Sequence, residues 1–88
     1  MNLKDMREEA IMTQGLLADA AKVSKVSLSR WENGVRMPGP TFIHRLAKAL
    51  GKTPQEVLHA AQESRRQYRE QEAKEHVSDN APMIAVAS

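Results

Sequence analysis

The feature that most constrains the fold of this chain is a pair of short amphipathic segments separated by only about three residues. Thr13 can cap a helix of roughly residues 14–20 with its hydroxyl, and Ser24 can cap the following helix in the same way. Asn33-Gly34 closes that second helix, because both residue types tolerate a left-handed backbone. So short a link forces the two helices to cross sharply.

The rest of residues 1–62 predicts further helices, and therefore a compact all-α domain of four to five helices. A helix of roughly residues 2–9 precedes the crossing pair, and another lies between the proline-containing turn at residues 37–40 and Gly51. The sequence TPQE at residues 53–56 is a complete capping box with proline at the first helical position, so a fifth helix begins there.

Apolar residues at helical spacing predict a core that is mostly aliphatic, since aromatic residues make up only 3% of the chain. The apolar positions of the first helix are Leu3, Met6, Ala10 and Ile11. The core positions expected further along the chain are Leu17, Ala18, Leu28, Trp31 and Leu46.

Residues 63–76 stay compatible with a helix but are polar, and we interpret them as an extension of the last helix. Glu63 and Arg66, like Glu70 and Lys74, have the spacing of ion pairs on a helix surface. The extension is either exposed to solvent or lies along a partner.

Residues 77–88 are interpreted as a short C-terminal tail, because Asn80-Ala81-Pro82 is expected to break any helix. The apolar run 83–87 leaves several alternatives open. It is disordered, or forms a dimerisation element such as an added strand, or is a degradation signal or a contact for another protein.

The composition excludes several classes of protein. The 88 residues are enough for one small domain, and the absence of cysteine removes disulfides, thiolate catalysis and cysteine-based zinc sites. The longest apolar run is far too short to span a membrane, and the first residues lack the pattern of a signal peptide. We therefore expect a cytoplasmic protein with no membrane contact.

The sequence also lacks the constellations that enzymes use. His44, His59 and His76 are far apart, and no set of histidine and carboxylate residues has the spacing of a metal site. There is no glycine-rich phosphate loop and no serine in the strained, glycine-flanked setting of a nucleophile. We expect no catalysis, no metal and no cofactor.

The distribution of charge favours a partner that carries phosphate. The net charge is only +2, but residues 22–36 contain four bases and the single acid Glu32. Such a local excess is typical of a surface that faces a phosphate backbone. An ordinary solvated surface is the alternative explanation.

Residues 13–34 read TQGLLADAAKVSKVSLSRWENG and closely resemble the phage-repressor-like (Cro/C1, XRE) helix-turn-helix family. The match continues through Pro38, the sequence LAKALG at residues 46–51, and Pro54 to Leu58, so it covers about two-thirds of the chain. The resemblance implies a lambda-repressor-like bundle. Its second helix would brace on the DNA backbone, and its third would enter the major groove.

The resemblance places four residues at positions that read bases: Lys25, Val26, Ser29 and Arg30. Arg30 can hold guanine O6 and N7 with two hydrogen bonds, Lys25 can reach the same acceptors, and Val26 can contact a thymine methyl group. The alternative for the two basic residues is contact with phosphate alone.

The resemblance also implies contacts to the DNA backbone, which position the protein without reading sequence. The residues concerned are Gln14, Lys22, Ser24, Ser27, Asn33 and Arg36. Gln14 begins the second helix, where an anion is favoured. The alternatives are a pure helix cap for Ser24 and a pure helix stop for Asn33. Trp31 is expected in the core and not on a base, and Glu32 is expected to hold a helix terminus or an arginine.

Lys22 and Val26 depart from the family pattern, Val26 because it replaces a commonly polar residue. The family usually has glycine in the turn between the second and third helices, where the backbone is left-handed, and this chain has Lys22. The substitution costs about 1 kcal/mol of strain and adds a positive charge near the DNA.

These features predict a sequence-specific transcriptional regulator that binds double-stranded DNA. The simplest form is a repressor that binds a palindromic operator as a homodimer, because one recognition helix reads only a few base pairs. The alternative is an antitoxin or another protein-interaction module. In that case residues 63–88 would be the arm that binds the partner protein.

Overall fold

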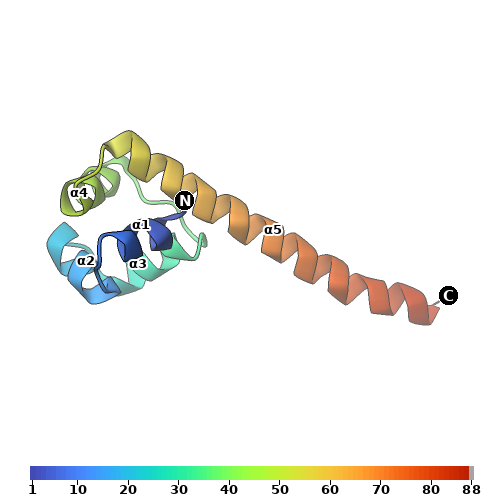
Figure 1. Cartoon of the computed structure of the whole chain (residues 1–88). Helices are drawn as coiled ribbons and strands as arrows, with labels where there is room; N and C mark the ends of the chain where they lie inside the picture. Colours follow the sequence, from blue (N-terminus) through green and yellow to red (C-terminus); the bar gives the residue numbers. More distant parts are fainter. Residues whose placement is uncertain (88) are drawn as a thin grey trace.

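The structure is a computed structural model that describes the backbone of residues 1–87 and the side chains of residues 1–73. Its five helices are α1 (Leu3–Glu9), α2 (Gln14–Ala21), α3 (Lys25–Glu32), α4 (Pro40–Leu50) and α5 (Pro54–Ala87). The described residues contain no strand, which confirms the predicted all-α class. Figure 1 shows α1 to α4 gathered around the first turns of α5, which then leaves the bundle.

The crossing pair of helices begins at the predicted caps. The Thr13 Oγ1 accepts a hydrogen bond from the Leu16 N–H at 3.1 Å, and the Ser24 Oγ accepts one from the Ser27 N–H at 3.0 Å. Each cap therefore satisfies a donor that the first turn of its helix leaves unpaired. Capping by these side chains explains why sequence alone located the beginnings of α2 and α3.

The core lies between α1 to α4 and the first turns of α5. The five core positions expected from Leu17 to Leu46 are all buried, and Leu28, Leu46 and Val57 have no exposed surface. Leu3 and Met6 are buried as well, whereas Ala10 and Ile11, which continue their apolar spacing, are exposed. The reason is that α1 ends at Glu9 and Ile11 turns left-handed, with φ of 57°, so the helical spacing stops before these residues.

The turn between α2 and α3 has the expected backbone. Lys22 adopts φ of 58° and ψ of 48°, the left-handed conformation that the family usually gives to glycine. At the end of α3 the left-handed residue is Gly34, with φ of 78°, whereas Asn33 keeps a right-handed backbone. Only the glycine of this pair therefore uses its conformational freedom.

Gly34 is also fixed by packing against α5. A Cβ atom at this position would lie 2.2 Å from the Ser64 carbonyl oxygen, so only glycine fits. The Arg65 Nη1 donates to the carbonyl oxygens of Gly34 at 2.8 Å and Val35 at 3.0 Å, and the Ser64 Oγ accepts from the Leu3 N–H at 3.1 Å. This part of α5 thus holds both the end of α3 and the start of the chain.

The helix α5 is longer than expected. The predicted break at Asn80-Ala81-Pro82 was wrong, because the helix continues to Ala87. A proline removes one backbone donor and strains the preceding turn, which can bend a helix without ending it. The predicted Glu63–Arg66 ion pair is present, and Arg66 also pairs with Glu70. The side chains of Lys74 and of the apolar run 83–87 lie outside the described residues.

Candidate nucleic-acid interface

The outer face of α3 carries the residues predicted to read bases. Lys25, Val26 and Arg30 are exposed and Ser29 is half-buried, while Leu28 and Trp31 on the opposite face are buried. The four predicted residues line one shallow hollow together with Gln14 of α2. The structure therefore brings together on one surface side chains that the sequence places up to 16 residues apart.

Gln14 is the first residue of α2, and its side chain is held in place from within the bundle. Its Nε2 donates a hydrogen bond to the Glu32 Oε1 at 3.1 Å. The Glu32 side chain is only 2% exposed, so the acceptor is fixed. The hydrogen bond thus orients the Gln14 amide beside the hollow on α3.

The buried carboxylate of Glu32 is neutralised by Arg7. The Arg7 Nε lies 2.7 Å from Glu32 Oε2 and its Nη2 lies 3.1 Å from Oε1, while Nη1 donates to the Met12 carbonyl oxygen at 2.8 Å. The hydrogen bond to Glu32 raises the pKa of Arg7, against the opposing effect of burial. The prediction that Glu32 holds an arginine is confirmed. A two-pronged arginine–carboxylate pair is the strong form of such a contact.

The hydroxyl groups at the start of α3 are linked to each other. Ser24 Oγ donates to Ser27 Oγ at 2.8 Å while it accepts from the Ser27 N–H, so its role as a cap is confirmed. At the other end of α3, the exposed Asn33 donates from Nδ2 to the Ser29 Oγ at 3.4 Å. Contacts of these residues with the DNA backbone stay predictions.

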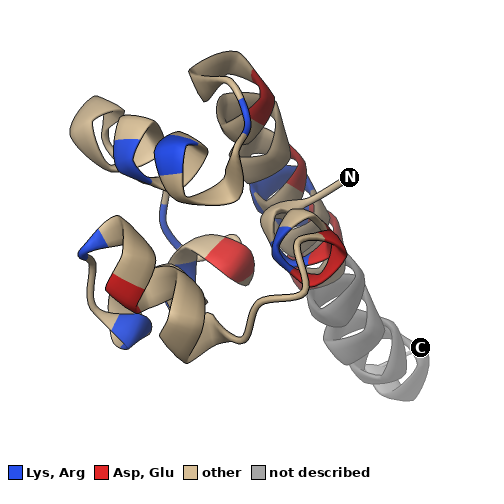
Figure 2. Cartoon of the chain, turned by 60° about the vertical axis from the view of Figure 1, so that its left-hand side comes forward, with Lys and Arg blue, Asp and Glu red and all other residues tan. Residues whose placement is uncertain are grey.

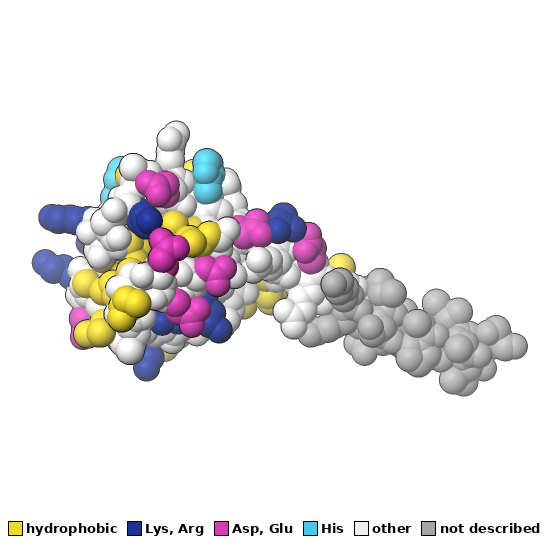
Figure 3. Space-filling view, in the orientation of Figure 1, with side chains coloured by type: hydrophobic (Ala, Val, Ile, Leu, Met, Phe, Trp, Pro, Cys, Tyr) yellow, Lys and Arg dark blue, Asp and Glu magenta, His cyan; other side chains and the backbone are white. Residues whose placement is uncertain are grey.

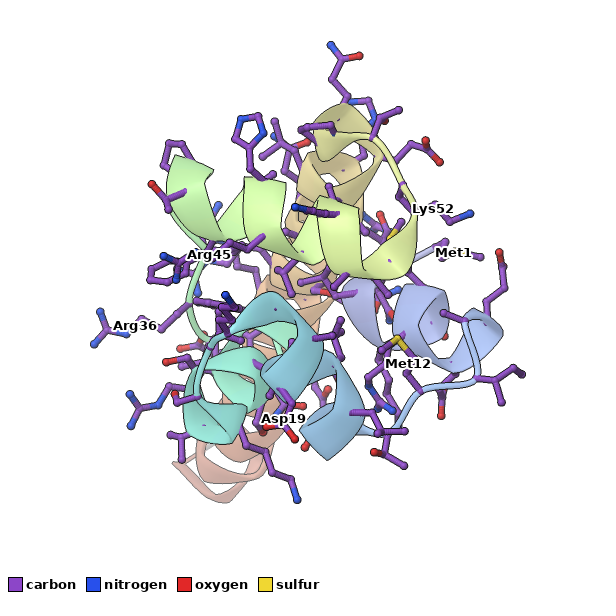
Figure 4. All side chains as sticks on the ribbon, turned by 90° about the vertical axis from the view of Figure 1, so that its left-hand side faces the viewer. Met1, Met12, Asp19, Arg36, Arg45 and Lys52 are labelled. Carbon is purple, nitrogen blue, oxygen red and sulfur yellow. The ribbon has the colours of Figure 1, made fainter. Side chains whose placement is uncertain are left out.

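The cations around α3 differ from three cations elsewhere on the bundle that are neutralised by carboxylates. Arg7, Lys52 and Arg66 form ion pairs with carboxylates, whereas Lys25, Arg30 and Arg36 form none among the described residues. Figure 4 shows Arg36 projecting from one edge of the bundle and Lys52 at the opposite edge. Acidic side chains instead gather on the face over α1 and the neighbouring part of α5 in Figure 3. The surface around α3 is therefore positively charged and open.

The comparison with family models decides the identity of this fold. A family model described as Helix-turn-helix matches residues 3–57, which run from the start of α1 into the first turn of α5. The chain belongs to the Cro/C1-type helix-turn-helix family. A search of the curated proteins found no match.

Because this helix-turn-helix protein belongs to that family, it is a DNA-binding regulator. Its helix-turn-helix motif consists of α2 and α3. Among the described helices, none has the length and apolar character needed to cross a membrane. The described residues also contain no cluster of histidine and carboxylate side chains able to hold a metal ion.

Sequence reasoning missed two residues that hold this helix-turn-helix surface in shape. Arg7 is 25 residues from Glu32, and Arg65 is 31 residues from Gly34. An arginine on an amphipathic helix normally lies on the solvated face. No local sequence pattern therefore predicts that Arg7 and Arg65 are half-buried and bind residues distant in the sequence.

Proposed function

We propose that this helix-turn-helix protein is a cytoplasmic repressor that binds a palindromic double-stranded DNA operator as a homodimer. The observation that carries the proposal is the hollow on the outer face of α3. Gln14, Lys25, Val26, Ser29 and Arg30 line it together, and its two cations have no carboxylate partner in the part of the chain that the structure describes.

Each residue of the hollow has a role that its chemistry supports. Arg30 and Lys25 suit the O6 and N7 acceptors of guanine, and the Val26 side chain, in a residue that is 61% exposed, suits a thymine methyl group. An exposed valine side chain leaves apolar surface in water in the free protein. Contact with a thymine methyl group in the groove would bury that surface. The Ser29 hydroxyl is a short donor or acceptor for either base pair.

The backbone contacts would fix this helix in the groove. We assign them to Gln14, Lys22, Ser24, Ser27, Asn33 and Arg36. Gln14 stands at the N-terminus of α2, where the unpaired N–H groups of the first turn favour an anion. Arg36 follows α3 and projects freely from the bundle (Figure 4). These contacts supply affinity and register but carry no sequence information.

The length of α3 supports a dimer. Eight residues of helix are about 12 Å long, so one copy covers only a few base pairs. A second copy related by a twofold axis would place its own α3 in the next major groove, about 34 Å away. Such a dimer on a promoter would block the polymerase, and this is the mechanism of repression that we propose.

Selection of bound sequences from a random duplex pool tests the proposal. The wild-type protein should enrich a palindromic motif, and Arg30→Ala should lose information at one symmetric pair of positions. Lys52→Ala is the matched control, because Lys52 lies at the opposite edge of the bundle and pairs with Glu9 at 3.6 Å. A motif that Arg30→Ala leaves unchanged would show that Arg30 contacts no base.

The projection of α5 from the bundle favours a second candidate function, an antitoxin or other protein-interaction module. A groove beside this helix is lined by Met37, Gln62, Arg65, Arg69 and Ala73, among others. Its lining combines the apolar Met37 and Ala73 with three arginines, Arg65, Arg66 and Arg69, and this mixture would suit a partner protein. No enriched motif in the selection, together with weak and salt-sensitive DNA binding, would favour this candidate over the repressor.

A further inference from the structure

A second basic hollow lies between the end of α2 and the outer face of α4. It is lined by Lys22, Arg45 and Lys48 and has a floor of small side chains, Ala20, Ala21 and Ala49. In Figure 2 the Lys and Arg positions of α4 lie on the same side of the bundle as those at the α2–α3 turn. Three cations of two different elements thus converge on one open surface.

These three cations have no carboxylate partner among the described residues. Helix α4 contains no acidic residue, and Asp19, the one acid of α2, forms no ion pair with any described residue. Elsewhere on the bundle, Arg7 and Arg66 form ion pairs with glutamates. The hollow therefore keeps an uncompensated positive charge that a bound anion would neutralise.

Arg45 is fixed where the two elements meet. Its Nη1 donates to the Lys22 carbonyl oxygen at 3.3 Å, and its guanidinium lies 5.6 Å from the centre of the Phe42 ring. This leaves other N–H groups of the guanidinium to point outward, since arginine has five donors. The contact also ties α4 to the turn that precedes the recognition helix.

The basic hollow is continuous with the surface of α3. The Phe42 ring under Arg45 packs 5.2 Å from the Trp31 ring, and it lines a neighbouring hollow together with Ser27, Arg30 and Arg36. Arg36 and Arg45 lie along the same edge of the bundle in Figure 4. A row of cations that lack carboxylate partners within residues 1–73 thus runs from α3 across Phe42 to α4.

We propose that Lys22, Arg45 and Lys48 bind the phosphate backbone of the DNA that flanks the bases read by α3. The proposal rests on the proposed function, because the flanking DNA must be held by α3. Lys22 lies two residues before the cap of α3, so a duplex seated on that helix brings a strand to this hollow. The small alanine side chains of the floor leave room for the strand to approach closely.

The size of the effect follows from counterion release. Each phosphate contact contributes about 0.9 to the slope of log Kd against log salt, which corresponds to about fivefold in affinity at 0.15 M salt. A symmetric dimer makes each contact twice. One substitution should therefore lower the slope by about 1.8 and weaken binding on the order of 30-fold.

The test compares the selected operator with long flanks and the same operator trimmed to the selected motif. Lys48→Gln should bind the long duplex more weakly, with the lower salt slope, and should bind the trimmed duplex as the wild type does. Arg45→Gln should behave in the same way. Lys52→Gln, at the opposite edge of the bundle, is the control and should match the wild type on both duplexes.

The Lys48 side chain forms no hydrogen bond or ion pair among the described residues, so Lys48→Gln should fold normally even if Arg45→Gln does not. Equal affinity of wild type and Lys48→Gln for the long operator would overturn the inference and leave the repressor proposal intact. Equal loss on both duplexes would also overturn it, because the contact would not lie on flanking DNA. The absence of any selected motif would overturn both proposals.

Discussion

The substitution Glu32→Gln tests how the buried ion pair supports the DNA-binding surface. The glutamate accepts from Arg7 at 2.7 and 3.1 Å and from Gln14 at 3.1 Å, and its side chain is 2% exposed. Glutamine has nearly the same shape but removes the negative charge and replaces one acceptor by a donor. The Arg7 guanidinium, with a side chain that is 11% exposed, would then be left charged and unpaired.

The expected cost is about 3–5 kcal/mol of unfolding free energy, because breaking a buried pair leaves an uncompensated charge. For a domain of this size the melting temperature should fall by roughly 15–30 °C. Arg66→Gln is the control. It breaks the surface pairs with Glu63 and Glu70, where solvent screens the charges, so it should cost far less unfolding free energy than Glu32→Gln.

Urea unfolding followed by circular dichroism measures both variants. The double variant Arg7→Met with Glu32→Leu should recover most of the lost stability, since an apolar pair avoids the cost of desolvating two charges. It should nevertheless bind operator more weakly, because Gln14 loses the acceptor that orients it. A loss of stability for Glu32→Gln no larger than that of the surface control Arg66→Gln would refute the reasoning.

Three further predictions concern single positions. Ile11→Gly should stabilise the fold by roughly 0.5–1 kcal/mol relative to Ile11→Ala in urea unfolding, because it relieves a left-handed backbone under a side chain that is 86% exposed. Equal stability of the two would contradict this. Hydrogen bonds from Thr53 lower the pKa of Glu56 below its ordinary 4.5, so its contribution to stability is present above that value and is lost as the pH falls through the lower one. Glu56→Gln should therefore flatten the decline of the melting temperature in acid, and an unchanged acid profile would argue against it. Gly34→Ala should cost about 2–5 kcal/mol in urea unfolding, because its Cβ would meet the Ser64 carbonyl oxygen. A loss under 1 kcal/mol would mean that α5 moves away easily.

The helix-turn-helix itself was predictable because its signals are local. Caps such as Thr13 and Ser24 act within three residues, and the left-handed turn at Lys22 lies between two helices whose bounds the caps and apolar spacing define. The exposed face of α3 follows from the same spacing, so Lys25 and Arg30 were found by sequence alone. Their contacts with bases remain to be tested by the selection experiment.

The sequence by itself therefore determined where the helices of the motif begin and most of the core, since each depends on neighbours within about one helical turn. The longer pattern over residues 3–57 determined the family. Only the tertiary structure decided the pairing of Arg7 with Glu32, the clamp of Arg65 on Gly34, and the meeting of Lys22 with α4. These contacts join residues 23 to 31 positions apart. The sequence around a charged residue on a helix does not show which distant residue it binds. Packing of the helices brings such residues together, and that packing shapes the charged surface offered to DNA.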